Sequence, residues 1–384
     1  MKPIRIISPN FELLGEISNY ESHMIIRSWS GIGTLEMRIS RYKKYADQLQ
    51  KGNIVFPFNE LHKAYIILHR EIELDENGKA TENWLVRALQ IKVITGRRIT
   101  LPPSHTAYDN RQGNAETVMK HYVSNNLVNP VDEKRKIEQL SLAVDQSRGT
   151  KVDWQSRFKN LSEELTSISQ LSGVGWNVIL DYKNKKWIFD VQEGKDLTVN
   201  QSIHSPVIFS PQFDSIKSMS YVQSELNYKN MAYVAGQGEG VNRRVLTLHD
   251  NLTGLNRHEL FIDARDVPEE TEDDPPQQRP EPEIIADLTN RGEQQLQEFL
   301  QEEYLEGQIL TKSPFVYEKD YDLGDMVTIQ NKDWGVTMDT RITEVKEIYE
   351  SSGFKLEATF GNNRPTLIQK IKQELSQISG EVRR

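Results

Sequence analysis

The sequence predicts an α+β fold that is mainly β, with two antiparallel β domains, a small α/β domain inserted between them and a C-terminal helix. Three observations lead to this class. Short runs of β-branched and aromatic residues, broken by Gly, Pro and Asn, fill residues 1–103 and return towards the C-terminus. Between these two parts, apolar residues recur at helical spacing. The order of elements in the first β-rich part is also found in the second.

Residues 1–103 are predicted to form the first β domain. Tyr42–Gln50 has a short helical pattern that stops before a glycine. Ala64–Leu74 and Glu82–Ile94 flank a polar turn, which is typical of an extended hairpin. The earlier strands form a meander and are expected at Ile4–Ile7, Leu13–Ile17, His23–Trp29 and Thr34–Ile39.

Residues 104–211 are predicted to form the inserted α/β domain, because the pattern changes after two consecutive prolines. Helical spacing indicates helices over Ala115–Asn126 and Asp153–Ser172. The segments Trp176–Tyr182 and Lys186–Val191 then form a hairpin across a short polar turn. The second helix is predicted from Trp154, Phe158, Leu161, Leu165, Ile168 and Leu171.

Residues 212–365 are predicted to form the second β domain. Met231–Ala235 and Val245–Leu248 are strand-like and enclose a polar, glycine-rich loop, so they form a long-looped hairpin. Glu259–Ala264 alternates apolar and polar residues and forms a third strand. Residues 268–283 are acidic and rich in proline, so we expect a solvated, extended loop there.

The remainder of this domain is predicted to contain one helix followed by four strands. The helix is predicted from Leu288, Leu296, Phe299, Leu300 and Tyr304. The strands are expected around Leu310–Val316, Met326–Gln330, Thr337–Tyr349 and Lys355–Phe360.

Residues 366–384 are predicted to form the C-terminal helix. Its apolar residues are spaced by three and four positions, which suits either a trimeric contact or packing against the helix's own domain. The candidate trimer-contact residues are Ile368, Ile371, Leu375 and Ile378.

One internal similarity relates the two β domains. The run Gly52–Val55 opens a segment that continues through a glycine turn to a last strand at Trp84–Leu89. The run Gly324–Val327 opens a similar segment, which ends in the strand Lys355–Phe360. The matching order predicts a duplicated β domain, although unrelated antiparallel hairpins can also share such an order.

Composition and charge exclude several classes of function. The chain has 384 residues, a formal charge of −9 and no cysteine. The acidity argues against a general grip on nucleic acid, which needs clustered Lys and Arg. Without cysteine there is no disulfide, thiolate zinc site or cysteine nucleophile. No apolar run is long enough for a signal peptide core or a membrane span, so we expect no membrane insertion.

The local motifs do not indicate an enzyme. Gly236, Gly238 and Gly240 lack the spacing of a dinucleotide-binding loop, and a strand-like run follows them instead of a helix. The eight histidines form no HxH or HExxH pattern, and there is no GxSxG. A pair of catalytic carboxylates stays open, because their separation in space is invisible in a sequence. We expect no cofactor and no metal.

Several runs spread over nearly the whole chain together carry a family resemblance. They are AYIILHREIELDENGKATENW, AYVAGQGEG, RHELFIDARD, DLGDMVTIQNKDWGVTMDTRITEVKEIYE and FGNNRPTL. The chain resembles the siphophage tail-hub family of phages and prophages of Gram-positive bacteria. This family is similar to the baseplate hubs of long-tailed phages and to the hub domain of tail-associated lysins.

The resemblance implies a structural baseplate or tail-tip hub. Its two β domains would be of the tail-tube type, and three copies would form a homotrimeric, pseudo-sixfold ring that closes the distal end of the tail tube. Because the chain ends soon after the hub, no enzymatic activity is expected. The alternatives are a tail-associated peptidoglycan hydrolase and a receptor-binding or carbohydrate-binding tail protein.

The resemblance also implies the partners and the place. The partners are further copies of the chain, the distal tail protein, the tail tube and tape-measure proteins, and receptor-binding or fibre proteins. No specific nucleic acid sequence is expected. The protein would be assembled in the host cytoplasm and act in the virion in host attachment and DNA ejection. Asp263, Arg265 and Asp266 are expected to fix a structural corner or a subunit contact.

Overall fold

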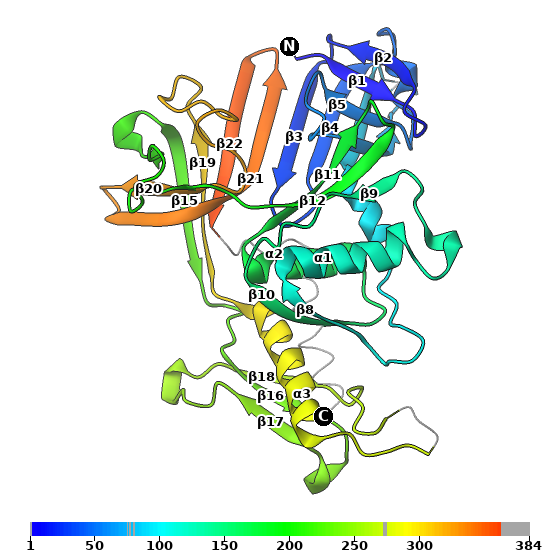
Figure 1. Ribbon diagram of the computed structural model, residues 1–384. Helices are drawn as coiled ribbons and strands as arrows, with labels where there is room; N and C mark the ends of the chain where they lie inside the picture. The colour runs from blue at the N-terminus through cyan, green and yellow to red at the C-terminus, as the bar shows by residue number, and fades with distance from the viewer. Residues whose placement is uncertain (1, 75, 77, 80, 272–274, 362–384) are drawn as a thin grey trace.

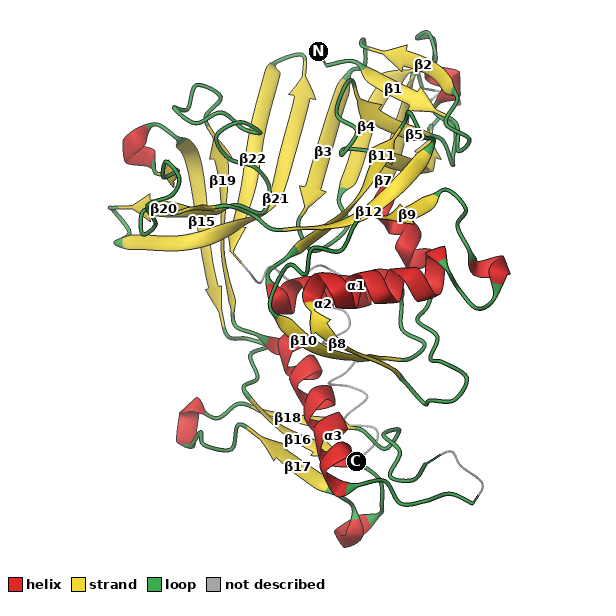
Figure 2. Ribbon diagram, viewed as in Figure 1, coloured by secondary structure: helices red, strands yellow, loops and turns green. Residues whose placement is uncertain are grey.

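The computed structural model describes residues 2–74, 76, 78–79, 81–271 and 275–361. Strands predominate and pair mostly antiparallel (Figure 1). The three α-helices described lie below the main sheet in the view of Figure 2. In the described part, one sheet has fourteen strands and three smaller sheets accompany it. The predicted α+β, mainly β fold class is confirmed.

The first half-sheet is built from the residues before position 91 and has the strand order β3-β4-β7-β6-β5-β1-β2. In β3 (Ser22–Ser28) every second side chain is buried, which is the period-two pattern of a strand with one covered face. The other strands are β1 (Ile4–Ile7), β2 (Leu13–Ile17), β4 (Thr34–Ser40), β5 (Ile54–Pro57), β6 (Tyr65–Glu71) and β7 (Asn83–Gln90).

The second half-sheet has the strand order β15-β19-β22-β21, with β20 against the first part of β21. β21 (Val336–Glu350) is long enough to pair with β20 at its start and with a different strand at its end. The other strands are β13 (Asp196–Leu197), β14 (Ile208–Phe209), β15 (Ile216–Ser224), β19 (Glu302–Ile309), β20 (Met326–Asn331) and β22 (Gly353–Gly361).

The two half-sheets share one strand order, because β3-β4-β7-β6-β5 corresponds to β15-β19-β22-β21-β20. The correspondence extends to single hydrogen bonds. Gly52 N donates to Ile67 O at 2.8 Å, and Gly324 N donates to Ile342 O at 2.8 Å. Both glycines have a positive φ, and the pairing with the next strand slips by one residue just after each isoleucine. The same local geometry therefore opens both segments.

A single strand pair, which we call the seam, joins the half-sheets into one surface. Glu344–Glu350 of β21 pairs antiparallel with Ser22–Ser28 of β3. The blue β3 and the orange β21 consequently lie side by side in Figure 1, although more than 300 residues separate them in the chain.

A central layer, residues 98–192, packs against the first half-sheet. In α2 (Leu161–Ser172) the Asn160 side chain accepts a hydrogen bond from Ser162 N, and Gly173 ends the helix at φ 76°. The other elements are α1 (Ala115–Val123), β8 (Asp109–Asn114), β9 (Leu140–Leu142), β10 (Lys151–Ser156), β11 (Gly175–Asp181) and β12 (Lys186–Gln192).

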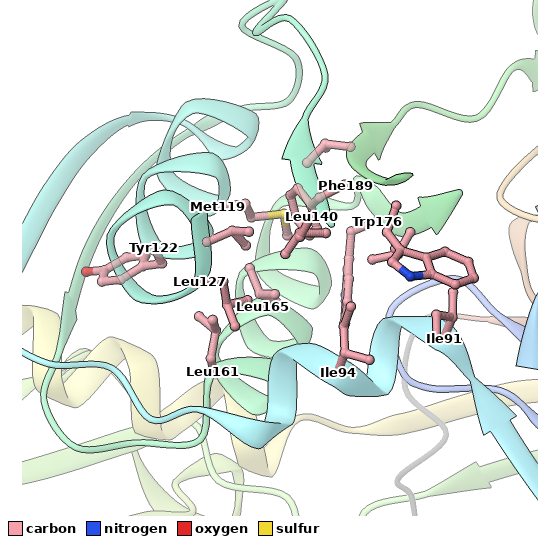
Figure 3. Packing of buried hydrophobic residues seen from close by; sticks show 14 of the residues in the cluster. Ile91, Ile94, Met119, Tyr122, Leu127, Leu140, Leu161, Leu165, Trp176 and Phe189 are labelled. Atoms are coloured by element: carbon pink, nitrogen blue, oxygen red, sulfur yellow. The ribbon is translucent and has the colours of Figure 1, made fainter. Parts of the chain in front are cut away.

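The core of the central layer is continuous with the first half-sheet. Met119 and Leu165 from its two helices lie in the same cluster as Ile91 and Ile94, which directly follow β7 (Figure 3). Residues on both sides of position 103 therefore share one core. The predicted boundaries at 103, 211 and 365 stay predictions.

A lower lobe, residues 225–301, is inserted between β15 and β19. Its parallel and antiparallel strands β16 (Met231–Ala235), β17 (Val245–Leu248) and β18 (Glu259–Asp263) are covered on one face by α3 (Glu281–Leu296). Gly292 allows the close approach, because a Cβ there would lie 2.2 Å from Leu248 Cδ1. The predicted hairpin of β16 with β17 is confirmed, and β18 joins it in parallel.

Shorter helical turns connect these elements. They are η1 (Ala46–Gln48), η2 (Ile91–Arg97), η3 (Ser124–Val128), η4 (Glu133–Arg135), η5 (Pro211–Phe213), η6 (Gly240–Asn242), η7 (Gly254–Asn256) and η8 (Gln297–Phe299). The predicted helix over Tyr42–Gln50 is thus wrong in extent, since only η1 within it is helical.

Two further predictions are wrong at helix ends. Trp154 belongs to β10, which pairs with β8, and Phe158 lies in a turn with φ 54°. Tyr304 belongs to β19, whose inward-facing Leu305 and Ile309 are buried, while Leu310–Val316 is a loop. In each case the apolar residues fit both periods, and pairing with a neighbouring strand decided between them.

Two glycines with positive φ give a matched test of the packing next to the seam. A Cβ on Gly324 would lie 2.1 Å from the ring of buried Trp29, whereas a Cβ on Gly335 meets nothing within 4 Å. We expect Gly335→Ala to cost about 1 kcal/mol for its backbone strain, and Gly324→Ala clearly more. Urea unfolding of both variants measures the difference, and equal costs would contradict this packing.

Candidate assembly sites

The seam contains a buried cluster of charges centred on Arg27 of β3. Its Nη1 donates to Tyr317 Oη at 2.6 Å, to Asp322 Oδ1 at 2.8 Å and to Glu318 Oε1 at 3.2 Å. Burial alone would lower the pKa of Arg27, but Tyr317 and the two carboxylates outweigh it and raise the pKa well above its usual value. Arg27 therefore ties β3 to the loop that precedes β20.

Lys63 extends the cluster from the loop before β6. Its Nζ lies 2.5 Å from Glu347 Oε1 on β21, 2.9 Å from Glu318 Oε1 and 3.1 Å from Glu60 Oε2. Both Lys63 and Glu347 are almost fully buried. Burial raises the pKa of Glu318, but hydrogen bonds from His62 and Lys63 lower it well below the usual range. The first and second half-sheets thus share these ion pairs.

Trp29, directly after β3, is the contact between the seam and the central layer. Its Nε1 donates to Gly173 O at 3.0 Å, and Trp176 Nε1 donates back to Ser30 O at 2.7 Å. Buried Lys92 donates to the carbonyl oxygens of Ser28 and Trp176. Burial lowers the pKa of Lys92 well below its usual value. The C-terminal end of β3 therefore joins the two half-sheets and the central layer.

His23 on β3 lies in the core beside the seam. Its ring is 5.3 Å from the ring of Tyr20 and 5.7 Å from that of Tyr349, centroid to centroid. Among the described residues neither ring nitrogen has a hydrogen-bond partner. Burial, together with the charges of Lys2 and Lys63, lowers the pKa of His23 to about 3. The imidazole is therefore neutral at physiological pH.

Two of the three predicted corner residues come together at the end of β18. Asp263 is 2.6 Å from Arg265 Nη2 and 2.7 Å from Arg243 Nη2, and these contacts lower its pKa to about 2. Arg243 also donates to the carbonyl oxygens of Ala235 and Gly236. It thus fastens the glycine-rich loop to β18. No sequence pattern pointed to Arg243, because only the folded loop brings it to Asp263.

Asp266, the third predicted residue, takes part in a different contact. It accepts hydrogen bonds from Tyr108 of the central layer and from Arg291 of α3. Tyr108 precedes it by 158 residues, so no sequence pattern signals this contact. A structural corner or subunit contact at these three residues stays a prediction. The predicted helix contacts at Ile368, Ile371, Leu375 and Ile378 lie outside the described residues.

Two surface hollows lie along the large sheet. One, of about 460 Å³, runs over β15, β19, β22, β21 and β3 and is lined by Glu306, Glu344, Lys346 and Glu357 among others. The other, of about 580 Å³, lies where the seam meets the central layer, with Arg27, His62, Arg148 and Asp325 in its wall. Both walls mix charges of opposite sign, and salt bridges join Lys346 to Glu357 and Arg27 to its carboxylates.

The described residues offer little for catalysis. Within them, no group of three or more His, Asp or Glu side chains is placed to hold a metal ion. None of the described helices is long and apolar enough to cross a membrane. The close polar contacts of the seam join one part of the fold to another.

The fold is similar to that of two tail proteins, one of them from a prophage. The 43 kDa tail protein of prophage MuSo2 from Shewanella oneidensis matches with a TM-score of 0.55 and 12% identity, over 94% of this chain and 98% of that chain. The tail protein from Neisseria meningitidis MC58 matches with a TM-score of 0.53 and 12% identity, over 94% and 96%. The architecture is thus one that tail proteins of this kind have.

The sequence identifies the family. The model of the Siphovirus ReqiPepy6 Gp37-like protein family matches residues 3–362, and the chain belongs to this family. It is a phage tail protein, and the expected membership of a siphophage tail family is confirmed. No curated protein matches the sequence.

The buried ion pair at the seam can be tested with a double-mutant cycle. Lys63→Met leaves the carboxylate of Glu347 buried without its cation, so we expect a loss of about 3 kcal/mol or more. Adding Glu347→Leu should recover most of this loss. Lys346→Met, which removes a half-exposed partner of Glu357, should cost less than about 1 kcal/mol. Urea unfolding measures the free energy of unfolding of these three variants and of Glu347→Leu alone. A harmless Lys63→Met would contradict the assignment.

His23 should make stability depend on pH. The unfolded chain binds a proton at its ordinary pKa of 6.5, whereas the folded chain binds it only near 3, so acid favours unfolding between these values. The expected loss approaches about 1.4 kcal/mol per pH unit. His23→Phe should remove this component.

The measurement is the urea midpoint at several values between pH 7 and pH 4. His105→Phe, at an exposed position, serves as the matched control and should retain the wild-type dependence. An unchanged slope in His23→Phe would refute the role of His23.

Proposed function

We propose that the protein is a structural hub of the baseplate or tail tip of a long-tailed phage or prophage. In this proposal three copies form a ring with pseudo-sixfold symmetry, and the ring closes the distal end of the tail tube. The observation that carries the proposal is the strand order shared by the two half-sheets. Three copies supply six half-sheets of one topology, which matches a tube with sixfold symmetry.

The proposed partners divide between two ends of the molecule. The ring meets the distal tail protein, the tail tube and the tape-measure protein on one side, and receptor-binding or fibre proteins on the other. In support, the lower lobe projects away from the large sheet (Figure 1). Its side chains Leu226, Val241 and Leu255 are each more than 90% exposed. In a protein contact there, these side chains would bury apolar surface that now faces water.

In this role the protein acts in attachment and DNA ejection through its shape and contacts, without an enzymatic step. The carboxylates of the seam support this view, because Glu318, Asp322 and Glu347 are committed to ion pairs with Arg27 or Lys63. Glu318, whose pKa these contacts hold well below the usual range, is a poor general acid. Incubation with peptidoglycan should therefore release no fragments, whereas clearing would favour a tail-associated hydrolase.

The ring is tested on tails purified from the phage or induced prophage that encodes the chain. We expect the protein at the tail tip, with threefold symmetry in electron micrographs. Light scattering of the isolated protein should give about three times the chain mass of 44.4 kDa. Absence from purified virions, or a tip complex without threefold symmetry, would overturn the proposal.

A further inference from the structure

We propose that neighbouring copies join edge to edge, with β15 of one copy pairing antiparallel with the end of β6 in the next copy. The contact repeats between chains the geometry that the seam has within one chain. The inference rests on the proposed ring and adds to it the two edges that meet and their register.

Both edges are open in the described chain. β15 pairs with β19 on one side and with no described strand on the other. β6 pairs with β7 over its whole length, but with β5 only through Tyr65 and Ile66. After the hydrogen bond between Gly52 N and Ile67 O, the side of β6 that faces away from β7 is uncovered. Its residues His69–Glu71 are thus available for another strand.

The seam shows which strand pairs with an edge of this kind. β6 and β21 occupy the same position in the strand order of their half-sheets, as do β15 and β3. In the second half-sheet, the part of β21 beyond Ile342 is covered by β3. In the equivalent part of β6, beyond Ile67, no described strand takes this place. In the proposed contact, β15 of the next copy takes the place that β3 has at the seam.

The register follows from equivalent residues. The one-residue slips in pairing make Ile67 of β6 equivalent to Ile342 of β21. The paired residues can then be followed from strand to strand, through β4 in the first half-sheet and through β19 in the second. In this way Ile26 of β3 is equivalent to Val222 of β15. At the seam Ile26 faces Lys346. Between copies the equivalent partners are Val222 and Glu71, with Gln223 opposite Arg70 and Ser224 opposite His69.

The side chains agree with this register. Met219 and Tyr221 of β15 pack against the core of the second half-sheet, so they and Gln223 share its inner face. On β6 the half-buried guanidinium of Arg70 lies 3.7 Å from the centroid of the Trp84 ring, on the inner side. The pairing therefore sets inner residues opposite inner residues. A slip of one residue would turn one of the two strands inside out.

The same contact closes a ring. Seven strand-to-strand steps separate β15 from β6 within one chain, which is about 34 Å along the sheet. One chain therefore cannot join its own two edges. Each copy offers one β15 edge and one β6 edge, so the contact is head to tail and forms a closed ring if every step turns by the same angle. Each chain contributes two such steps, its own seam and its contact with the next chain. A ring of six equal steps therefore contains three copies.

Because the chain has no cysteine, engineered disulfides test the contact cleanly. Trp29 N donates to Thr343 O, so Ile26 and Lys346 form a non-hydrogen-bonded pair, and so should Val222 and Glu71. The Cα atoms of such a pair are about 4.5 Å apart, within reach of a disulfide. We expect Glu71→Cys/Val222→Cys to form a disulfide-linked ladder that ends at the trimer on non-reducing gels.

The matched control asks whether β15 pairs with the other outer edge of the sheet, β2. Glu16→Cys/Val222→Cys places the first cysteine on β2, where it should give no cross-link. Cross-linking through Glu16 in place of Glu71 would overturn the inference. Both double variants are examined as isolated protein and in tails of phage that carry them.

A second variant avoids cysteine. The bond from Trp29 N shows that alternate residues of β3 direct their N–H towards β21, and Gln223 is equivalent to one of them, Arg27. Gln223→Pro removes an N–H that β19 does not use, so the chain should fold but lose the ring. Val222→Pro removes an N–H directed to β19 and should also reduce the thermal stability of the chain.

The outcomes separate this inference from the proposed function. A trimer that cross-links through residues 71 and 222 supports both. A trimer that light scattering detects but that does not cross-link there rejects the edge pairing and leaves the hub in place. Purified tails without a threefold hub reject the proposed ring, and the edge pairing with it.

Discussion

The antiparallel pairing of β3 with β21 is the interaction on which the rest of the structure depends. It makes one surface from two half-sheets that are far apart in the chain. The ion pairs of Arg27 and Lys63 are buried along it. Since burying two charges costs about as much as their attraction returns, these pairs contribute more to register than to stability. A slip by one residue would turn Glu347 away from Lys63, and the buried carboxylate would lose its cation.

The repeated half-sheet explains how the other parts are attached. In the first half-sheet the connection from β3 to β4 is a short hairpin turn, whereas the equivalent connection from β15 to β19 contains the whole lower lobe. The central layer is inserted between the two half-sheets and packs on the first. Each insertion leaves the shared strand order unchanged. The scaffold is therefore constant, and the surfaces that differ are placed on its connections, where added residues disturb no strand pairing.

Much of the local structure followed from the sequence, and the errors share one cause. The hairpins of β11 with β12 and of β16 with β17 were predicted correctly, because a turn between two short apolar runs is a local signal. Trp154 and Tyr304 were assigned to helices, although both lie in strands. An apolar residue at a helix end fits the helical and the strand period equally, and only the neighbouring strand distinguishes them.

The candidate sites divide in the same way. Asp263 and Arg265 were recognised because they lie two residues apart at the end of one strand. Arg27, Tyr108 and the pair of Lys63 with Glu347 gave no signal, because these partners lie more than 150 residues apart and a lone charge in a sequence is usually solvent-exposed. Such contacts arise only when the backbone topology has brought distant segments together.

By itself, then, the sequence determined the fold class, the repeated order of elements and the family, since these depend on local periodicity and on residue runs along the chain. Only the tertiary structure decided that the half-sheets form one surface, that the central layer shares a core with the first of them, and which edges stay open. The physical reason is that strand pairing joins backbones through hydrogen bonds that every residue can make. The sequence therefore shows where strands are, and the fold shows which of them meet.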